Sequence, residues 1–529
     1  MRKICVIFMA AILLSSAAIM AACQNQPQGT EGTLSIASFE GGYGDTWASA
    51  LAQAYKQQNP EIDVVVDTSP LVRDDAVTAL QTGVSSVDLF FIDGASIGTY
   101  CEVYDTLAEL NEVYESKPKA GGVEEDIFIK DKLRPEIVQE MTYGGDREPY
   151  VGNYYTVPTP SGPNSLILNV DALNLALGEG NWEVPVTTDE MMNLADRIKA
   201  ANATVNVAGI NHTIYPFIYS GDAVEYLRYL SHAWVAQHDG AETFRNSQSY
   251  KIDGKYNQAA FNPPGKLIAY TAIERILKRA NNYCDPSSMG NKPSASQKYF
   301  FQNRAAMYIT GDWLEREMEA ATEYHAELIM VKPPVISALS QKLETEYSVN
   351  LGATAAVKDQ KLAEIIDAVD AGETSLEGVS QQVFDAVKES RSIIYSLANN
   401  AIGFMPRSSV NKELAIDFLR FMYSDEGIAI VMRESKSNLP IAGMTYESSA
   451  NDSNFRKSVM EIESSGVQYI FSSSRDPIRY RAGVDEYIGN EKPEIAFGKR
   501  TGALTAAQQL QKEISALADS WSEYMEYVE

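Results

Sequence analysis

Residues 34–47 read LSIASFEGGYGDTW and determine how the fold begins. Apolar and polar residues alternate at the start of this stretch, as in a strand, until the glycines at 41–44 interrupt the pattern. From Thr46 onwards, apolar residues recur at helical spacing as far as Asn59-Pro60, and alternation resumes at 62–66. Because a strand, a helix and a strand in succession form a right-handed crossover, we expect the two strands to lie parallel.

A second loop of the same kind follows a third predicted strand. A helix is predicted around 74–81, and the apolar run 87–92 then ends at Asp93-Gly94. The loops at 39–45 and 93–99 therefore both follow parallel strands. In open α/β sheets, ligands bind in the crevice at the carboxyl ends of the strands. We therefore expect these two loops to border a binding crevice.

The rest of the chain repeats this pattern and then becomes mostly helical. Strands are predicted at 166–169 and 305–309, and the second of them ends at Gly311-Asp312-Trp313, where a helix begins. Between them, Thr188 is predicted to cap a helix. In the last third of the chain, apolar residues recur mainly at helical spacing. The sequence therefore predicts the α/β class with a helix-rich C-terminal part.

The N-terminus has the pattern of a secretory signal peptide over residues 1–22. Two basic residues precede the apolar run 4–19, which is too short to span a bilayer. The small residues before Cys23 resemble a bacterial lipobox, which implies that Cys23 becomes the lipid-modified first residue, carrying acyl chains such as palmitate. Residues 23–32 are polar and contain Pro and Gly, which predicts a tether. We expect a lipid-anchored protein on the extracytoplasmic face of the cell membrane, with an unlipidated secreted protein as the alternative.

Composition and charge narrow the possible partners. The chain has 529 residues, of which 45% are hydrophobic, so it can form two or more domains with their own cores. The net charge is −27 and becomes more negative when the signal peptide leaves. Such a charge repels nucleic acid and anionic lipid headgroups, so membrane association must come from the anchor.

The cysteines and histidines do not predict a metal site. Beyond the signal peptide and Cys23, the cysteines are Cys101 and Cys284, which either form a disulfide or remain two buried thiols. The chain has no CxxC motif, and its four histidines do not recur at metal-binding spacing. We therefore expect neither a metal nor a cofactor.

In their order along the chain, seven segments resemble an extracellular solute-binding protein of the family-1, maltose-binding-like class, which feeds ABC importers. These segments are LSIASFEGGYGDTW (34–47), SSVDLFFIDG (85–94), YYTVPTP (154–160), SLILNVDAL (165–173), PVTTDEMMNLADRI (185–198), FFQNRAAMYITGDW (300–313), and KELAIDFLRFMYSDEG leading to NLP (412–440). The helical stretch near 358–400 resembles an insertion into this pattern.

The resemblance implies two α/β lobes that are joined by hinge strands and hold a sugar-sized ligand between them. Hinge closure around the ligand would then be a population shift. The chain is expected to cross between lobes near 150–160, 305–311 and 340–350. The expected division is 33–150 with 311–345 for lobe one, and 155–305 with 346–529 for lobe two, including the helical insertion.

Carbohydrate binding requires aromatic faces and planar polar groups, which suggests candidate residues in both lobes. On the predicted loops these are Glu40, Tyr43, Asp93, Ser96, Asp312 and Trp313, of which the resemblance selects Glu40, Tyr43, Asp93 and Trp313 as ligand contacts. Tyr219, Trp234 and Trp182 could form the opposite wall. For each candidate the alternative is a capping or packing role, and Trp47 is predicted to be a core residue.

One motif suggests an enzyme instead. Residues 94–98 match G-x-S-x-G, so Ser96 could be a nucleophile with His325 or another histidine as its base, although no oxyanion-hole motif accompanies it. A carboxylate pair of a glycosidase is a further alternative, but no two acids are singled out. The first loop lacks the third glycine of G-x-G-x-x-G and does not predict dinucleotide binding.

Taken together, the sequence predicts a monomeric, non-enzymatic receptor that captures a small solute. The expected solute is a mono- or oligosaccharide, and the expected partner is an ABC permease in the membrane. The alternatives are a charged cargo such as a polyamine, a metal complex or a phosphorylated compound, and an anchored hydrolase.

Overall fold

The computed structural model describes residues 31–94, 96–319, 325–444, 449–472, 475–484, 488 and 491–528. The predicted signal peptide at 1–22, the predicted lipidation site Cys23 and most of the tether at 23–32 lie outside the described residues. None of the described helices is long and apolar enough to cross a membrane.

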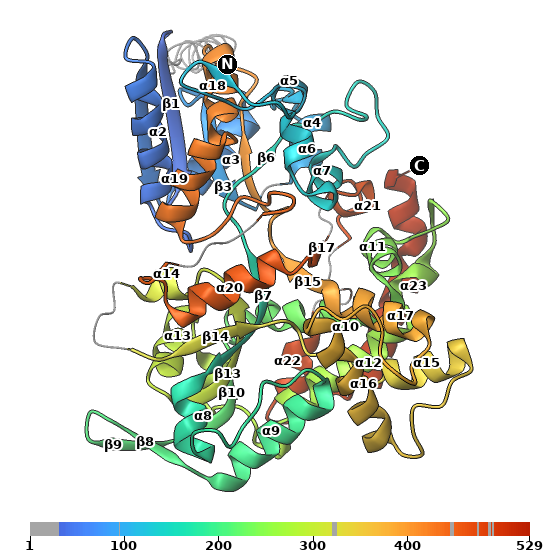
Figure 1. Cartoon of the computed structure of the whole chain (residues 1–529). Coiled ribbons are helices and arrows are strands. Elements are labelled where there is room, and N and C mark those ends of the chain that lie inside the picture. The colour runs from blue at the N-terminus through green and yellow to red at the C-terminus, as the bar shows by residue number, and fades with distance from the viewer. Residues whose placement is uncertain are drawn as a thin grey trace, which may run out of the picture.

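The first lobe is built on a five-stranded sheet in the order β2-β1-β3-β16-β6 (Figure 1). Its strands β2, β1 and β3 are parallel, so the crossover predicted from residues 34–66 is confirmed, and β16 runs antiparallel to β3. Helices α2, α18 and α19 pack together on this lobe. The bounds are β1 (Thr33–Phe39), α2 (Thr46–Gln58), β2 (Asp63–Ser69), α3 (Val72–Thr82), β3 (Leu89–Asp93), β6 (Val157–Pro158), β16 (Ala401–Phe404), α18 (Lys412–Met422) and α19 (Asp425–Ser435).

The second lobe is built on a sheet in the order β10-β13-β7-β15-β17, with β14 also paired to β7. Its core includes the buried faces of helices α9, α10 and α12. Thr187, one residue before the predicted Thr188, caps α9 in a capping box with Glu190. The bounds are β7 (Pro163–Asn169), α9 (Thr188–Ala201), β10 (Tyr215–Ile218), α10 (Arg228–Asp239), α12 (Pro264–Leu277), β13 (Ala305–Gly311), β14 (Leu328–Val331), β15 (Ile393–Ser396) and β17 (Gln468–Ile470).

Strand pairing corrects the expected division into lobes. Residues 311–345 were expected in the first lobe, but β14 pairs with β7 of the second. Residues 346–529 were expected in the second lobe, but β16 pairs with β3 of the first. The chain passes between the sheets from β6 to β7, from β15 to β16, and from α19 to α20 (Asn454–Ser464).

Of the three crossings expected between the lobes, one lies beside an observed crossing and two do not. The crossing expected near 150–160 lies beside the β6–β7 passage. Those expected near 305–311 and 340–350 are wrong, because they fall within β13 and within α15 (Leu339–Tyr347), which both belong to the second lobe. The helical stretch near 358–400 forms α16 (Ala355–Asp370) and α17 (Gln381–Ser392), which pack beside each other on the second lobe, before β15.

The two cysteines of the folded chain are free thiols. Cys101 is buried in the first lobe, on α4 (Ile97–Glu102), and burial raises its pKa to about 12. Cys284 belongs to the second lobe, where its thiol donates to the carbonyl of Ile276 at 3.3 Å. The structure therefore decides for thiols between the two alternatives that the sequence left open.

A buried ion pair joins the lobes beside their crossings. Arg134 precedes α7 (Pro135–Met141) on the first-lobe side, and its Nη2 lies 2.8 Å from Oε2 of Glu463 on α20. The guanidinium also donates to the carbonyl of Val467 at 2.9 Å and stacks over the ring of Tyr469 at 4.6 Å. Arg134 and Glu463 are only 8% and 4% exposed, so removing the guanidinium leaves the Glu463 carboxylate buried without its ion-pair partner.

We predict that Arg134→Met lowers the free energy of unfolding by about 3–5 kcal/mol at neutral pH, as expected for breaking a buried pair. Burial already raises the pKa of Glu463. Its protonation should therefore remove the unpaired charge, so the loss should shrink as the pH falls through that raised pKa. Urea unfolding at several pH values measures both effects. The exposed pair of Arg433 and Glu434 supplies the control Arg433→Met, and equal losses in the two variants would contradict the prediction.

Candidate ligand-binding cleft

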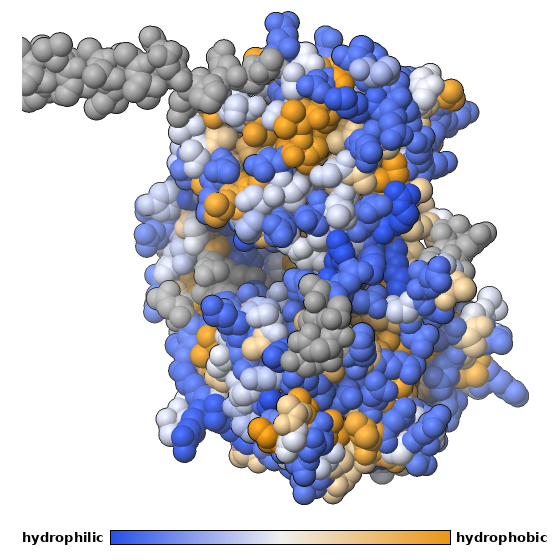
Figure 2. Space-filling model, turned by 90° about the vertical axis from the view of Figure 1, so that its left-hand side faces the viewer, coloured by the Kyte–Doolittle hydropathy of each residue, from blue (hydrophilic) through white to orange (hydrophobic). Residues whose placement is uncertain are grey.

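A cavity of about 660 Å³ lies between the two lobes. The surface is recessed between the lobes on the side seen in Figure 2. The first lobe contributes residues 38–39 at the end of β1, residues 41–44 after it and residues 91–93 at the end of β3, so the predicted crevice lies at the carboxyl edge of this sheet. The second lobe and the crossing segments contribute residues 225–226, 228–229, 313, 317, 395, 397, 399–400, 159–160 and 472.

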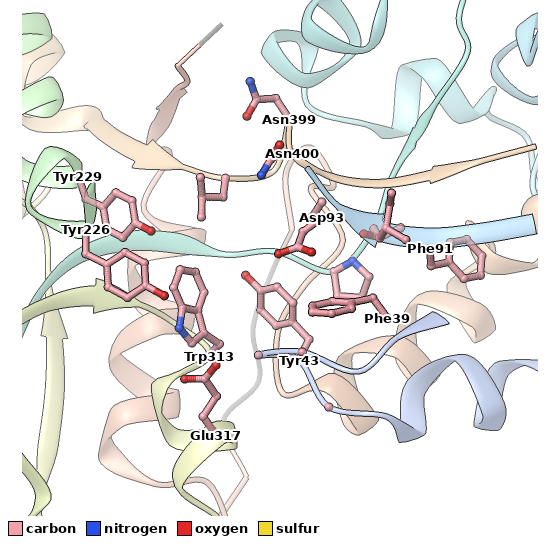
Figure 3. Close-up of a pocket in the computed structure, with 18 of the residues that line it drawn as sticks. Phe39, Tyr43, Phe91, Asp93, Tyr226, Tyr229, Trp313, Glu317, Asn399 and Asn400 are labelled. Atoms are coloured by element: carbon pink, nitrogen blue, oxygen red, sulfur yellow. The ribbon is translucent and has the colours of Figure 1, made fainter. Parts of the chain in front are cut away.

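Aromatic rings form much of the cavity wall, and Trp313 lies at their centre (Figure 3). Tyr43 from the first lobe meets Trp313 nearly edge-on, with ring centroids 6.1 Å apart and an angle of 87°. Tyr226 and Tyr229 from the second lobe approach it at 5.9 and 6.4 Å. Tyr229 in turn stacks on Tyr395 at 5.1 Å. Such a cluster provides apolar ring surfaces for a flat ligand together with phenol groups for its polar edge.

The phenols of this cluster remain neutral at ordinary pH. Burial raises the pKa of Tyr43, Tyr226 and Tyr229 above the usual value for tyrosine. A protonated phenol both donates and accepts hydrogen bonds. Two neighbouring amides, Asn399 and Asn400, add planar polar groups at the passage from β15 to β16. The cleft therefore combines ring faces with neutral hydrogen-bonding groups.

Glycine allows the first-lobe loop to reach across the cleft. A Cβ atom at Gly42 would lie 2.9 Å from Cβ and Cγ of Trp313, which real Cβ atoms essentially never do. The backbone of the loop therefore packs directly on the second-lobe tryptophan. This close approach explains why a glycine-rich segment follows β1.

The four charged side chains that line the cavity all have partners. Asp93 pairs with Arg73, whose guanidinium also lies 4.3 Å from the ring centroid of Phe39. Glu317 accepts a hydrogen bond from the Gln297 amide, and burial raises its pKa. The remaining two pairs are Glu225 with Lys492 at 2.8 Å and Arg228 with Glu494 at 3.9 Å. Charge in the cleft is therefore largely compensated by the protein itself.

The structure brings Tyr43, Asp93 and Trp313 together in the cavity wall, where the sequence placed them. Trp47, predicted as a core residue, is buried beside Phe91 and also reaches the cavity.

The other candidates from the predicted loops, Glu40, Ser96 and Asp312, do not line the cavity. Asp312 is buried behind it and accepts a hydrogen bond from the Tyr43 hydroxyl at 3.0 Å. Glu40 is exposed, and its backbone N–H donates to the carbonyl of Ser69.

The second-lobe candidates lie elsewhere. Trp234 is fully buried and donates its indole N–H to the carbonyl of Pro334 at 3.0 Å, so it belongs to the core. Tyr219 is also buried in the core, and Trp182 donates to Asn174. The rings in the wall come instead from Tyr226 and Tyr229 before and at the start of α10 and from Tyr395 on β15. The i, i+3 spacing of Tyr226 and Tyr229 was a signal that could have identified one shared face.

The hydrolase alternative gains no support from the geometry. The Ser96 hydroxyl is exposed and shares a hydrogen bond with the Thr99 hydroxyl at 2.8 Å. Within the part of the chain that the structure describes, no hydrogen bond joins Ser96 to a histidine, and His325 is exposed. Among the same residues, no three His, Cys, Asp or Glu side chains gather into a group that could hold a metal ion.

Comparisons with known proteins agree with this two-lobed geometry. The family of bacterial extracellular solute-binding proteins matches residues 50–452. The diacetylchitobiose binding protein NgcE of Streptomyces coelicolor is 22% identical over 306 residues, which cover 56% of this chain and 57% of NgcE. The chain thus matches little more than half the length of that curated relative.

Two solved structures share the fold. A chitin oligosaccharide binding protein has a TM-score of 0.53 at 15% identity, covering 90% of this chain and 95% of that protein. RafE in complex with raffinose has a TM-score of 0.55 at 14% identity, covering 93% and 99%. The predicted resemblance and the predicted fold are confirmed, and the chain belongs to the family of bacterial extracellular solute-binding proteins.

Proposed function

We propose that this solute-binding protein captures an uncharged mono- or oligosaccharide in the inter-lobe cleft and delivers it to an ABC permease. The observation that carries the proposal is the cluster of Tyr43, Tyr226, Tyr229 and Tyr395 around Trp313. Pyranose rings present apolar C–H faces, which pack well on aromatic rings. Their hydroxyls need neutral and planar hydrogen-bonding groups, which Asn399, Asn400 and the phenols supply.

The electrostatics of the cleft favour an uncharged ligand over a polyamine, a metal complex or a phosphorylated compound. A bound ion would need a counter-charge, because burying an unpaired charge is costly. Asp93, Glu225, Arg228 and Glu317 are already engaged by protein partners. The ligands of the relatives agree with this choice, since NgcE is a diacetylchitobiose binding protein and RafE was solved with raffinose.

We also propose that the protein is anchored to the membrane and that it releases the sugar without a chemical reaction. Lipidation of Cys23 would hold the two lobes near the permease, and the polar tether would let them reach it. Binding would close the lobes, because Trp313 and Tyr43 belong to different lobes and both border the cleft. The protein would release the sugar to the permease chemically unchanged, because the cleft binds the sugar and does not cleave it.

The first test is calorimetric titration with diacetylchitobiose, a chitin oligosaccharide and raffinose. We expect at least one to bind, with an affinity that changes less than about two-fold between ~0.05 and ~0.5 M salt. Chromatography of the recovered sugar should show no cleavage. Binding restricted to charged compounds, with strong salt dependence, would contradict the proposal, and so would hydrolysis that Ser96→Ala abolishes.

The second test removes the aromatic centre of the cleft. Trp313→Ala should weaken binding of the best sugar by more than about 1 kcal/mol, or about five-fold, because an aromatic platform is lost. Trp182→Ala is the matched control, since Trp182 is half-buried on the second lobe away from this cavity. Equal affinities of the Trp313→Ala variant and the wild type, with the fold intact by circular dichroism, would remove Trp313 from the site.

The third test concerns the anchor. Cys23→Ala should move the protein from the membrane fraction to the soluble fraction and impair uptake, while leaving sugar affinity unchanged, because Cys23 lies before the folded lobes. Fractionation and titration of the same variant measure both effects. Retention of the variant in the membrane fraction would contradict lipid anchoring at Cys23.

A further inference from the structure

Asp312 stands next to the central tryptophan of the cleft, yet its side chain serves a different purpose. It lies between Gly311 and Trp313 at the end of β13, and its carboxylate is turned away from the cavity and only 5% exposed. One carboxylate oxygen accepts from the Tyr43 hydroxyl at 3.0 Å, and the other accepts from the Ser437 hydroxyl at 2.5 Å. Both oxygens are therefore engaged by hydroxyl donors.

These contacts cross from one lobe to the other. Asp312 belongs to the second lobe, Tyr43 lies in the first-lobe loop after β1, and Ser437 follows α19 at a crossing. The backbone N–H of Gly162, at the β6–β7 crossing, donates to the Tyr43 hydroxyl at 3.4 Å. A Cβ atom at Gly162 would lie 2.3 Å from the carboxylate, so only glycine allows this approach. The Asp312 carboxylate thus lies where the cleft wall meets two of the crossing segments.

We propose that Asp312 is a positioning residue, which holds the Tyr43 ring beside Trp313 in the closed arrangement and so couples lobe closure to completion of the binding surface. The inference rests on the proposed function, because it concerns how that cleft is assembled. Tyr43 meets Trp313 at 6.1 Å while its hydroxyl reaches past the cavity to Asp312. Opening the lobes enough to separate these rings breaks the Tyr43–Asp312 bond.

The position of Asp312 gives closure a pH dependence of definite sign. Burial raises the pKa of Asp312 to about 6, the hydroxyls of Ser437 and Tyr43 oppose the rise, and on α20 the charge of Glu463 adds to it while Arg456 opposes it. When the lobes open and water reaches the carboxylate, its pKa returns to about 4. Closure therefore takes up a proton. Sugar affinity should consequently rise about ten-fold as the pH falls from ~7 to ~5.

Two conservative variants test this coupling. Asp312→Asn keeps an oxygen acceptor but cannot titrate, so the roughly ten-fold rise in sugar affinity that we ascribe to Asp312 should disappear. Tyr43→Phe keeps the ring but removes the anchoring hydroxyl, so affinity should fall about five-fold. Without sugar, amide hydrogen exchange of residues 41–44 should become faster in Tyr43→Phe, which separates loss of anchoring from loss of a direct sugar contact.

The first lobe offers a matched control. The Tyr55 hydroxyl donates to Asp417 at 3.0 Å, and both residues lie on helices of that lobe, α2 and α18. Tyr55→Phe and Asp417→Asn should leave the affinity, its pH profile and the exchange of residues 41–44 unchanged.

The titrations use the sugar among diacetylchitobiose, the chitin oligosaccharide and raffinose that the wild type binds most tightly. If that sugar binds and Asp312→Asn has the wild-type pH profile, the inference is overturned while the proposed function stands. If none of the three binds to the wild type, the proposed function fails. The exchange of residues 41–44 then decides the inference, and equal rates in Tyr43→Phe and wild type overturn it.

Discussion

The loop at 41–44 lies directly against Trp313, and the remaining geometry of the cleft follows from this contact. Side-chain atoms of Trp313 occupy the space that a Cβ atom at Gly42 would need, so the first lobe reaches the second without a gap. The contact places Tyr43 edge-on to the tryptophan and its hydroxyl on Asp312. A hinged receptor needs a surface that is complete only when its lobes meet, and this contact provides one.

Charge compensation in the same cleft supports the proposed preference for an uncharged ligand. The chain is strongly acidic, yet two of the three acids in the cavity wall pair with cations, Asp93 with Arg73 and Glu225 with Lys492, and the third, Glu317, accepts a hydrogen bond from Gln297. The acidic surface of the protein therefore does not make the cleft a binding site for cations. Ring faces and neutral donors remain for recognition, which is the chemistry that suits a sugar. The outer charge keeps the molecule away from anionic surfaces, so a tether would hold it near the membrane more effectively than contact would.

Local patterns allowed part of this structure to be predicted. Alternation, helical spacing and the glycine interruption predicted β1, α2 and β2 and placed Tyr43 at the sheet edge, and the apolar run 87–92 placed Asp93 there. The sequence could not predict which sheets contain β14 and β16, because a short apolar strand does not reveal which distant strand it pairs with. Likewise, Trp234 and Tyr229 lie on one helix, and its packing in the lobe decides which ring faces the core. Asp312 was placed next to the correct tryptophan, but its direction depends on Ser437, far along the chain.

A crystal structure with a bound oligosaccharide would show directly whether the sugar lies in the inter-lobe cleft. We predict closed lobes, a pyranose ring packed within the aromatic cluster around Trp313, and sugar hydroxyls within hydrogen-bonding distance of Asp93, Asn399 or Asn400. The Tyr43–Asp312 bond should be intact in that complex. Sugar bound elsewhere, for example in the polar groove beside Trp182 on the second lobe, with the inter-lobe cleft empty, would contradict the account.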